Sequence, residues 1–340
     1  MERMTTPRGF SSRGASPNRL AGTLGADIVH PHDAMLHSAF HKGNVAVVTG
    51  GASGIGKAAV IAFAEFGMRV AVADRDATKL QETSEEVKSR FPNTDIVTFT
   101  VDVSKYDEVS TFADRVYEWA GTVSVVLNNA GIGPVGGKAW EGLDQWRSII
   151  DVNLMGVVNV QQAFVPHMLP NENPSLFINT GSKQGITNPP GNAAYNASKA
   201  AVKSLTEGLA HELRQRQSVV TAHLLIPGWT WTPLGGQSSE GKTKPPGAWT
   251  PQQVVKYMLD QVHRGAFYIV CPDNETSSVL DRLRIRWAAE DIIEGRSALS
   301  RWDPDYAPLF EEYIRAGLVG GANHQSLSRS ISQENLEPDH

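Results

Sequence analysis

Several features are scarce in this sequence, and each scarcity narrows the possibilities. Cys271 is the only cysteine, so an internal disulfide is excluded, which fits a reducing compartment such as the cytoplasm. No uninterrupted apolar run is long enough to span a bilayer; the most apolar stretch, 58–73, is broken by a glutamate, a glycine and an arginine. The formal net charge of −5 gives no sign of a nucleic-acid or membrane partner.

Histidines with the spacing of a metal site are also lacking. Four of the ten, His30, His32, His37 and His41, gather in an irregular N-terminal region, where a solvated segment is the simpler interpretation. We therefore expect no catalytic metal.

The N-terminal region has none of the periodicity of a folded domain. Residues 1–19 carry four arginines against one acid, among serine, threonine, proline and glycine. A disordered extension and an arginine- and serine-rich mitochondrial targeting peptide are the two interpretations. Pro7, Gly9 and Gly14 oppose an amphipathic helix, so the disordered extension is favoured. No apolar segment of a secretory signal is present.

From Val45 onward, apolar strand-like runs alternate with helix-like segments. The expected strands cover 45–49, 69–74, 96–101, 123–127, 176–179, 219–226 and 267–271. The expected helices cover 57–66, 78–90, 106–119, 144–164, 193–214, 252–263, 278–293 and 304–316. Such alternation predicts an α/β fold with a doubly wound parallel sheet of about seven strands and helices on both faces. The predicted parts are an extension (1–41), the α/β domain (42–272), a helical C-terminal extension packed on the same domain (273–318) and a flexible tail (319–340).

A glycine cluster, Thr49 to Gly56, lies where a phosphate site is expected. It joins a strand to a helix, where glycines permit a tight turn and the helix N-terminus offers free N–H groups. Tight packing alone is the competing interpretation. Asp74 ends the next strand, and a carboxylate there holds the ribose hydroxyls of an adenosine and repels a 2′-phosphate. Arg75 follows directly, which leaves NADP open.

A second cluster, 181–199, places a hydroxyl at Ser182, a phenol at Tyr195 and an ammonium at Lys199. The phenol and the ammonium are four residues apart, so they share one face of a helix. A neighbouring ammonium favours the phenolate and lowers the phenol pKa, which suits a proton-transfer residue. Taken singly, Ser182 could be a turn cap and Lys199 a surface charge.

Together these motifs resemble the short-chain dehydrogenase/reductase family. The matching residues are Thr49-Gly50-x-x-x-Gly54-Ile55-Gly56, Asn128-Asn129-Ala130-Gly131, Asn153, Ser182, Tyr195-x-x-x-Lys199, and Pro227-Gly228 followed by Thr232. The resemblance covers about 42–271, with the motifs in the family's order. Of the seven tyrosines, only Tyr195 has a lysine four residues on.

The resemblance implies a Rossmann-type fold, a nicotinamide cofactor and a role for each matching residue. Tyr195 would be the general acid/base, and Ser182 would hold the substrate oxygen beside it. Lys199 would lower the phenol pKa and bind the nicotinamide ribose, and Asn153 would hold a water of a proton relay. The implied NAD-binding residues are Gly50, Ser53, Gly54, Ile55, Gly56, Asp74, Asp102, Val103, Asn129, Ala130, Gly131, Tyr195, Lys199, Pro227, Gly228, Thr230 and Thr232.

The sequence also departs from the family pattern. Thr230 stands where an aliphatic residue is more usual, and the chain runs on for about 70 residues after Cys271 in place of the common Val-Asp-Gly-Gly-like end. That puts the usual tetramer packing in doubt, although a homodimer or homotetramer is still expected by resemblance. Trp229, Trp231 and Trp249 lie in the loop after the sixth strand. They suggest a bulky apolar or aromatic substrate, or else simply pack that loop.

We therefore expect an NAD(H)-dependent oxidoreductase that interconverts a secondary alcohol and a ketone. An NADPH-preferring ketoreductase of secondary metabolism is the nearest alternative. A non-catalytic protein that senses NAD(H) or docks a partner is the alternative from another class. The expected partner is a small molecule, with no nucleic acid and no membrane span.

Overall fold

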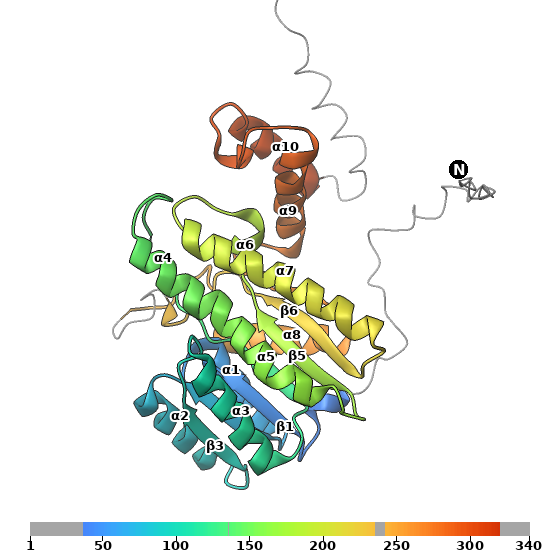
Figure 1. Cartoon of the computed structure of the whole chain (residues 1–340). Coiled ribbons are helices and arrows are strands. Elements are labelled where there is room, and N and C mark those ends of the chain that lie inside the picture. The colour runs from blue at the N-terminus through green and yellow to red at the C-terminus, as the bar shows by residue number, and fades with distance from the viewer. Residues whose placement is uncertain (1–36, 135, 235–241, 320–340) are drawn as a thin grey trace, which may run out of the picture.

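The computed structural model describes residues 37–134, 136–234 and 242–319 (Figure 1). Within these ranges one parallel sheet of seven strands has the order β3-β2-β1-β4-β5-β6-β7. The strands are β1 (Val45–Thr49), β2 (Arg69–Asp74), β3 (Ile96–Thr100), β4 (Val125–Asn128), β5 (Ser175–Thr180), β6 (Val220–Ile226) and β7 (Tyr268–Val270). The predicted doubly wound α/β fold is confirmed.

Helices cover both faces of this sheet, which is why its strands are apolar on both sides. One face carries α1 (Gly54–Glu65), α2 (Ala77–Arg90) and α8 (Pro251–His263). The other carries α3 (Tyr106–Ala120), α5 (Gly156–Met168) and α7 (Ala193–Gln215). The strand order reverses between β1 and β4, and Thr49 lies beside Asn128 in their register. A crevice at such a point is the usual ligand site of open α/β sheets.

The segment expected as one uninterrupted helix, 144–164, is instead two helices with a wider turn between them. α4 (Leu143–Ile150) leads into a π-helical turn, Asp151–Met155, which continues as α5. π-Turns inside helices are frequent at functional sites, and this one contains Asn153. The whole stretch Leu143–Met168 is long and apolar enough to cross a membrane by length and composition alone. Val160 and Phe164 of this stretch are wholly buried in the core beneath the sheet, and this burial accounts for the apolar character of the stretch.

Residues just before the expected domain boundary at residue 42 pack against the core. Ser38–Phe40 form a 3₁₀ turn, and the Phe40 ring is 1% exposed and stacks on Phe63 with 5.6 Å between ring centroids. Since Phe40 belongs to the core beside α1, the domain begins before residue 42. The rest of the expected extension, 1–36, and the expected tail from 320 onward lie outside the described residues.

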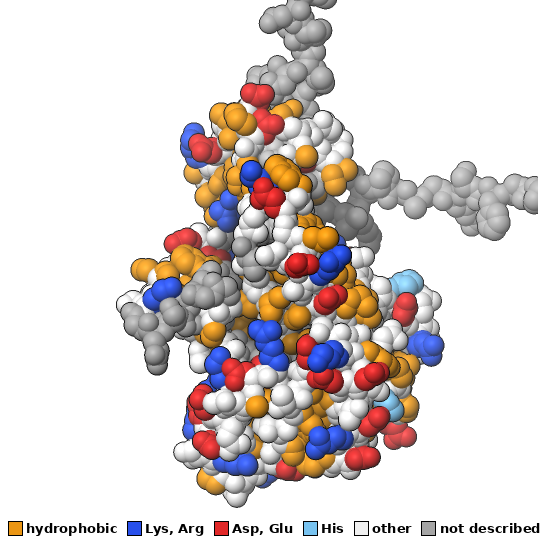
Figure 2. Space-filling model, turned by 60° about the vertical axis from the view of Figure 1, so that its left-hand side comes forward, with side chains coloured by type: hydrophobic (Ala, Val, Ile, Leu, Met, Phe, Trp, Pro, Cys, Tyr) orange, Lys and Arg blue, Asp and Glu red, His pale blue; other side chains and the backbone are white. Residues whose placement is uncertain are grey.

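The C-terminal extension is a pair of helices, and we call residues 278–319 the C-terminal hairpin. It consists of α9 (Ser278–Ile293), a 3₁₀ turn (Ser300–Trp302) and α10 (Ala307–Val319). Its small core contains Leu283, Trp287, Phe310 and Tyr313. The hairpin stands out from the body of the protein, and α9 contacts the short helix α6 (Gln184–Thr187) (Figure 1). Charges of both signs are interspersed on the face drawn in Figure 2, with no large patch of one sign.

Candidate active site

The glycine cluster forms a compact turn between β1 and the N-terminus of α1. Gly50 and Gly54 have φ values of +66° and +53°, which other residues rarely adopt. Gly56 packs beneath the turn, where an added Cβ would lie 2.1 Å from the Gly50 carbonyl oxygen. The turn therefore keeps its backbone close. The first residues of α1, Gly54 and Ile55, line the crevice, where the N–H groups of a helix N-terminus can bind an anion.

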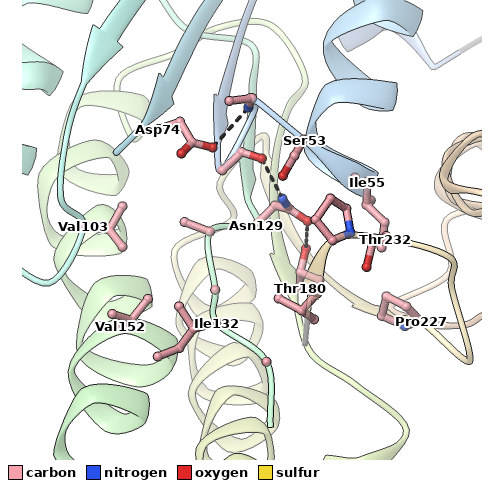
Figure 3. Close-up of a pocket in the computed structure, with 18 of the residues that line it drawn as sticks. Ser53, Ile55, Asp74, Val103, Asn129, Ile132, Val152, Thr180, Pro227 and Thr232 are labelled. Atoms are coloured by element: carbon pink, nitrogen blue, oxygen red, sulfur yellow. Dashed lines mark hydrogen bonds between the residues drawn. The ribbon is translucent and has the colours of Figure 1, made fainter. Parts of the chain in front are cut away.

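A cavity of about 520 Å³ extends from this turn across the carboxyl ends of the strands (Figure 3). It is lined by Ser182 and by every predicted cofactor residue except Gly56: Gly50, Ser53, Gly54, Ile55, Asp74, Asp102, Val103, Asn129, Ala130, Gly131, Tyr195, Lys199, Pro227, Gly228, Thr230 and Thr232. The lining also includes residues that sequence reasoning did not assign: Ala52, Ile132, Val152, Thr180 and Leu234. Thr180 could have been found, because it ends a strand at the same edge of the sheet.

Asp74 ends β2 and braces the glycine turn (Figure 3). Its Oδ2 accepts a hydrogen bond from the Ala52 N–H at 3.1 Å, and its Oδ1 accepts one from the Asp76 N–H at 3.1 Å. The carboxylate is thus fixed at the rim of the cavity. Arg75 and Lys79 line the same rim, so cations lie near this carboxylate.

A chain of hydrogen bonds joins the turn to Lys199. The Asn129 amide donates to the Gly50 carbonyl at 3.4 Å, and its oxygen accepts from the Thr180 hydroxyl at 3.3 Å (Figure 3). The Thr180 carbonyl in turn accepts from Lys199 Nζ at 2.8 Å. The two halves of the crevice are therefore held in one polar network, whose members support one another in a dry environment.

Tyr195 and Lys199 lie on the same face of α7, as their spacing predicts, and their exposed fractions are 6% and 4%. Lys199 Nζ is 5.9 Å from the centroid of the Tyr195 ring. Ser182 lies near enough to the Tyr195 phenol to favour its ionised form, and the Ser182 hydroxyl accepts the Gln184 N–H at 3.2 Å. The three predicted side chains thus meet at one end of the cavity.

The electrostatics of this cluster differ from the sequence-based expectation in one respect. Burial raises the pKa of the Tyr195 phenol, and the hydrogen bond from Ser182 only partly opposes that shift. Burial lowers the pKa of Lys199 to about 8. The expected lowering of the phenol pKa by Lys199 is absent from this structure, because desolvation of the phenolate outweighs the other effects and the ammonium is directed at Thr180.

Asn153 lies one layer behind the cavity and is fully buried. Its side chain accepts the Ile132 N–H at 2.8 Å and donates to the Ile132 carbonyl at 3.0 Å. A Cβ at Gly131 would lie 3.2 Å from Asn153 Oδ1 and 3.8 Å from Lys199 Nζ. Glycine at 131 therefore keeps side-chain atoms out of the space between these two polar groups.

A second cavity of about 300 Å³ opens on another side of Tyr195. Its lining combines apolar side chains such as Trp146 and Ile149 with the polar Lys138 and Glu141. Neither cavity is lined by Trp229, Trp231 or Trp249 among the residues with described positions. Trp249 instead packs edge-on against Tyr257, and its backbone bonds to Trp229 and Trp231 close the base of the loop. Those tryptophans therefore support loop packing rather than an aromatic substrate.

No cluster of histidine, cysteine and acidic side chains suited to a metal ion occurs in 37–134, 136–234 or 242–319.

Comparison with known proteins places this chain in a family. The family model described as short chain dehydrogenase matches residues 44–243. The 1-deoxy-11-beta-hydroxypentalenate dehydrogenase of Streptomyces exfoliatus is 37% identical over 205 residues, which cover 60% of this chain and 72% of that protein. The 3-oxoacyl-[acyl-carrier-protein] reductase of Thermotoga maritima is 35% identical over 193 residues, which cover 57% and 76%.

The solved structures that this chain resembles point to the same family. A short chain dehydrogenase/reductase from Burkholderia phymatum in complex with NAD is 29% identical, with a TM-score of 0.67, and the match covers 75% of this chain and 96% of that one. An alcohol dehydrogenase from Thermococcus sibiricus complexed with 5-hydroxy-NADP is 27% identical, with a TM-score of 0.60 and coverages of 65% and 91%. With its parallel sheet, its glycine turn and this similarity over more than half its length, the chain belongs to the short-chain dehydrogenase family of nicotinamide-dependent oxidoreductases.

Proposed function

We propose that this protein is an NAD(H)-dependent oxidoreductase that interconverts a secondary alcohol and a ketone, with Tyr195 as general acid/base. The observation that carries the proposal is that Ser182, the buried Tyr195 and the buried Lys199 line the same cavity, which begins at the glycine turn. A phenol in that position reaches a substrate oxygen, and the cavity is large enough for a dinucleotide to approach it.

The residues of the main cavity fit NAD. The turn at Gly50 and Gly54 allows close approach of a pyrophosphate to the N-terminus of α1. Asp74 suits the ribose hydroxyls of the adenosine, and its negative charge disfavours a 2′-phosphate. When bound, the nicotinamide would accept or supply the hydride.

The proton follows a path made by the chain's own residues. In alcohol oxidation the Tyr195 phenolate would take the hydroxyl proton while Ser182 holds the substrate oxygen, and the C–O bond becomes a carbonyl as the hydride leaves. In ketone reduction the phenol returns that proton. Lys199 would hold the nicotinamide ribose, and its pKa of about 8 keeps it mostly protonated at neutral pH. A water between Lys199 and Asn153, in the space that Gly131 leaves, would pass the proton onward.

The second cavity supports a bulky substrate with apolar or aromatic character. Trp146 and Ile149 offer apolar contact area directly beside Tyr195, and Lys138 and Glu141 add polar groups. Specificity would therefore depend on the segment before α4 and on α4 itself.

The test is turnover of a panel of cyclic and aromatic secondary alcohols with NAD⁺, followed by reduced-cofactor absorbance. Tyr195→Phe removes the proton acceptor and should lower kcat by at least about a hundredfold, while NAD⁺ still binds. Tyr117→Phe is the matched control, since this half-buried phenol lies on α3 away from the cavity. Undiminished activity in Tyr195→Phe would end the proposal.

An NADPH preference is the second candidate, favoured by Arg75 and Lys79 at the rim that Asp74 occupies. Dissociation constants for NADH and NADPH decide between the two. We expect tighter binding of NADH, and in Asp74→Ala a ratio shifted towards NADPH by about tenfold or more. Tighter NADPH binding to the wild-type protein would reverse the assignment. Binding of NADH without turnover on the whole panel would favour a non-catalytic sensor instead.

We also propose that the chain forms a homodimer or homotetramer through α4, α5 and α7. Leu143 at the start of α4 and Met155 at the end of the π-turn are 63% and 42% exposed, which supports a contact along these helices. Light scattering of the purified protein tests it, and a monomer would contradict it.

A further inference from the structure

We propose that Lys183 is a positioning residue through which the C-terminal hairpin holds the active-site loop in place. Lys183 directly follows Ser182, and its Nζ lies 2.7 Å from Asp281 Oδ2 and 3.3 Å from Asp273 Oδ2. The lysine side chain is 17% exposed and each aspartate side chain 6%. Asp281 belongs to α9 of the hairpin, and Asp273 lies between β7 and α9.

The segment that follows β6, residues 227–229, also contacts Lys183 and Asp273. Asp273 Oδ2 accepts the Trp229 N–H at 3.2 Å, and the Lys183 N–H donates to the Pro227 carbonyl at 3.3 Å. Gly228 lies against the ion pair: an added Cβ there would be 2.5 Å from Asp273 Oδ2 and 2.8 Å from Lys183 Nζ. Three segments distant in sequence are therefore joined around one ammonium, and two of them line the main cavity.

The geometry makes Lys183 a positioning residue rather than a catalytic one. It is absent from the described lining of both cavities, and its ammonium points to the hairpin. Its carbonyl accepts the Ile186 and Thr187 N–H groups at 3.0 and 3.1 Å, which starts α6. Since the Ser182 hydroxyl accepts the Gln184 N–H at 3.2 Å within the same turn, displacement of Lys183 displaces Ser182.

The charge arrangement explains why the link depends on lysine. Two poorly exposed carboxylates share one ammonium, so removal of the ammonium leaves two like charges facing each other in a dry interface. The hairpin then separates from α6, and the loop loses its support. The residues matched by the family model end at 243, so this support comes from a part of the chain outside that match.

The kinetic test rests on the proposed function and uses the full chain. Lys183→Met and Asp281→Asn should lower kcat by about tenfold, because Ser182 no longer holds the substrate oxygen, while the dissociation constant for NAD⁺ changes by less than about threefold. Lys183→Arg, which keeps the cation, should restore most of kcat. Lys203→Met is the control, since Lys203 forms a comparable 2.8 Å ion pair with Glu207 on α7. Folded variants of Lys183 and Asp281 with kcat within about twofold of wild type would refute the proposal.

Hydrogen exchange tests the link without any substrate. In Asp281→Asn and Lys183→Met, amide exchange should quicken in 181–187 and 227–230 as well as in the hairpin. Faster exchange confined to 278–319 would overturn the proposal, because the hairpin would then be a separate unit. If the wild-type protein turns over no alcohol, the proposed function fails, and the exchange experiment still decides whether Lys183 positions the loop.

Discussion

Lys199 Nζ donates to the Thr180 carbonyl oxygen at 2.8 Å, in a place where the two residues are only 4% and 7% exposed. The bond fixes the lysine of α7 to the end of β5, and Asn129 extends the connection to the glycine turn. A charge held in so dry a place is costly, which is why burial lowers the Lys199 pKa to about 8. Function and stability are therefore opposed at this residue.

Replacement of Lys199 should lower activity and raise stability. The pKa of Lys199 is lower in the folded chain than in the unfolded chain, so between about pH 8 and 10.5 the unfolded chain binds more protons than the folded chain. Below this range the buried, charged lysine destabilises the folded state. Lys199→Met should abolish turnover and yet raise the unfolding free energy at pH 7 by about 1–3 kcal/mol, less whatever the lost hydrogen bond contributes. Urea unfolding at a series of pH values measures the difference.

The sign fixes how this difference changes with pH. It should shrink as pH rises from about 8 towards 10.5, because over that range the amine of the folded chain is already neutral while the amine of the unfolded chain is still losing its proton. Lys203→Met removes a half-buried lysine from the same helix and is the control. A gap between wild type and Lys199→Met that stays constant with pH contradicts the assignment.

The Tyr195 phenol should titrate above its ordinary pKa in the protein without cofactor, because burial disfavours the phenolate. The phenolate absorbance of wild type minus Tyr195→Phe isolates this group during an alkaline titration. We expect its midpoint above 10.0 without cofactor and lower in the presence of NAD⁺, whose positive nicotinamide favours the phenolate. A midpoint below 10.0 in the cofactor-free protein would show that Lys199 dominates after all.

The sequence predicted most of the residues that line the main cavity, because many of them lie where strands end. The turn after Thr49, Asp74 at the end of β2 and Asn129 after β4 converge at one edge of a parallel sheet, so local patterns were enough to bring them together. Tyr195 and Lys199 needed only the helical period.

What the sequence could not show depends on burial and on distant contacts. The direction of the Tyr195 pKa shift follows from desolvation, which no spacing of residues reveals. No proline marks the π-turn around Asn153, so 144–164 looked continuous. The ion pair of Lys183 with Asp281 joins segments whose proximity arises only from the packing of α9 on α6.

Two glycine substitutions should have opposite effects. Gly56→Ala places a Cβ 2.1 Å from the Gly50 carbonyl oxygen and 2.8 Å from Asn129 Nδ2, so the turn must shift. We expect a loss of about 2 kcal/mol in unfolding free energy and of NAD⁺ binding. Gly208→Ala meets no atom within 4 Å on α7 and should stabilise the fold by about 0.5–1 kcal/mol. Calorimetric NAD⁺ titration and chemical unfolding measure both, and normal NAD⁺ affinity in Gly56→Ala would contradict the close packing of the turn.

The segment before β1 should contribute to stability although it precedes the family's motifs. The Phe40 ring is 1% exposed and stacks on Phe63, so Phe40→Ala should leave a cavity and cost about 3 kcal/mol in unfolding free energy. Chemical unfolding of the full chain gives the value. His41→Ala is the control, because this neighbouring side chain is exposed and should change stability little. An unfolding free energy in Phe40→Ala equal to that of wild type would place 37–41 outside the folded domain, where the composition of the N-terminal region first suggested they lie.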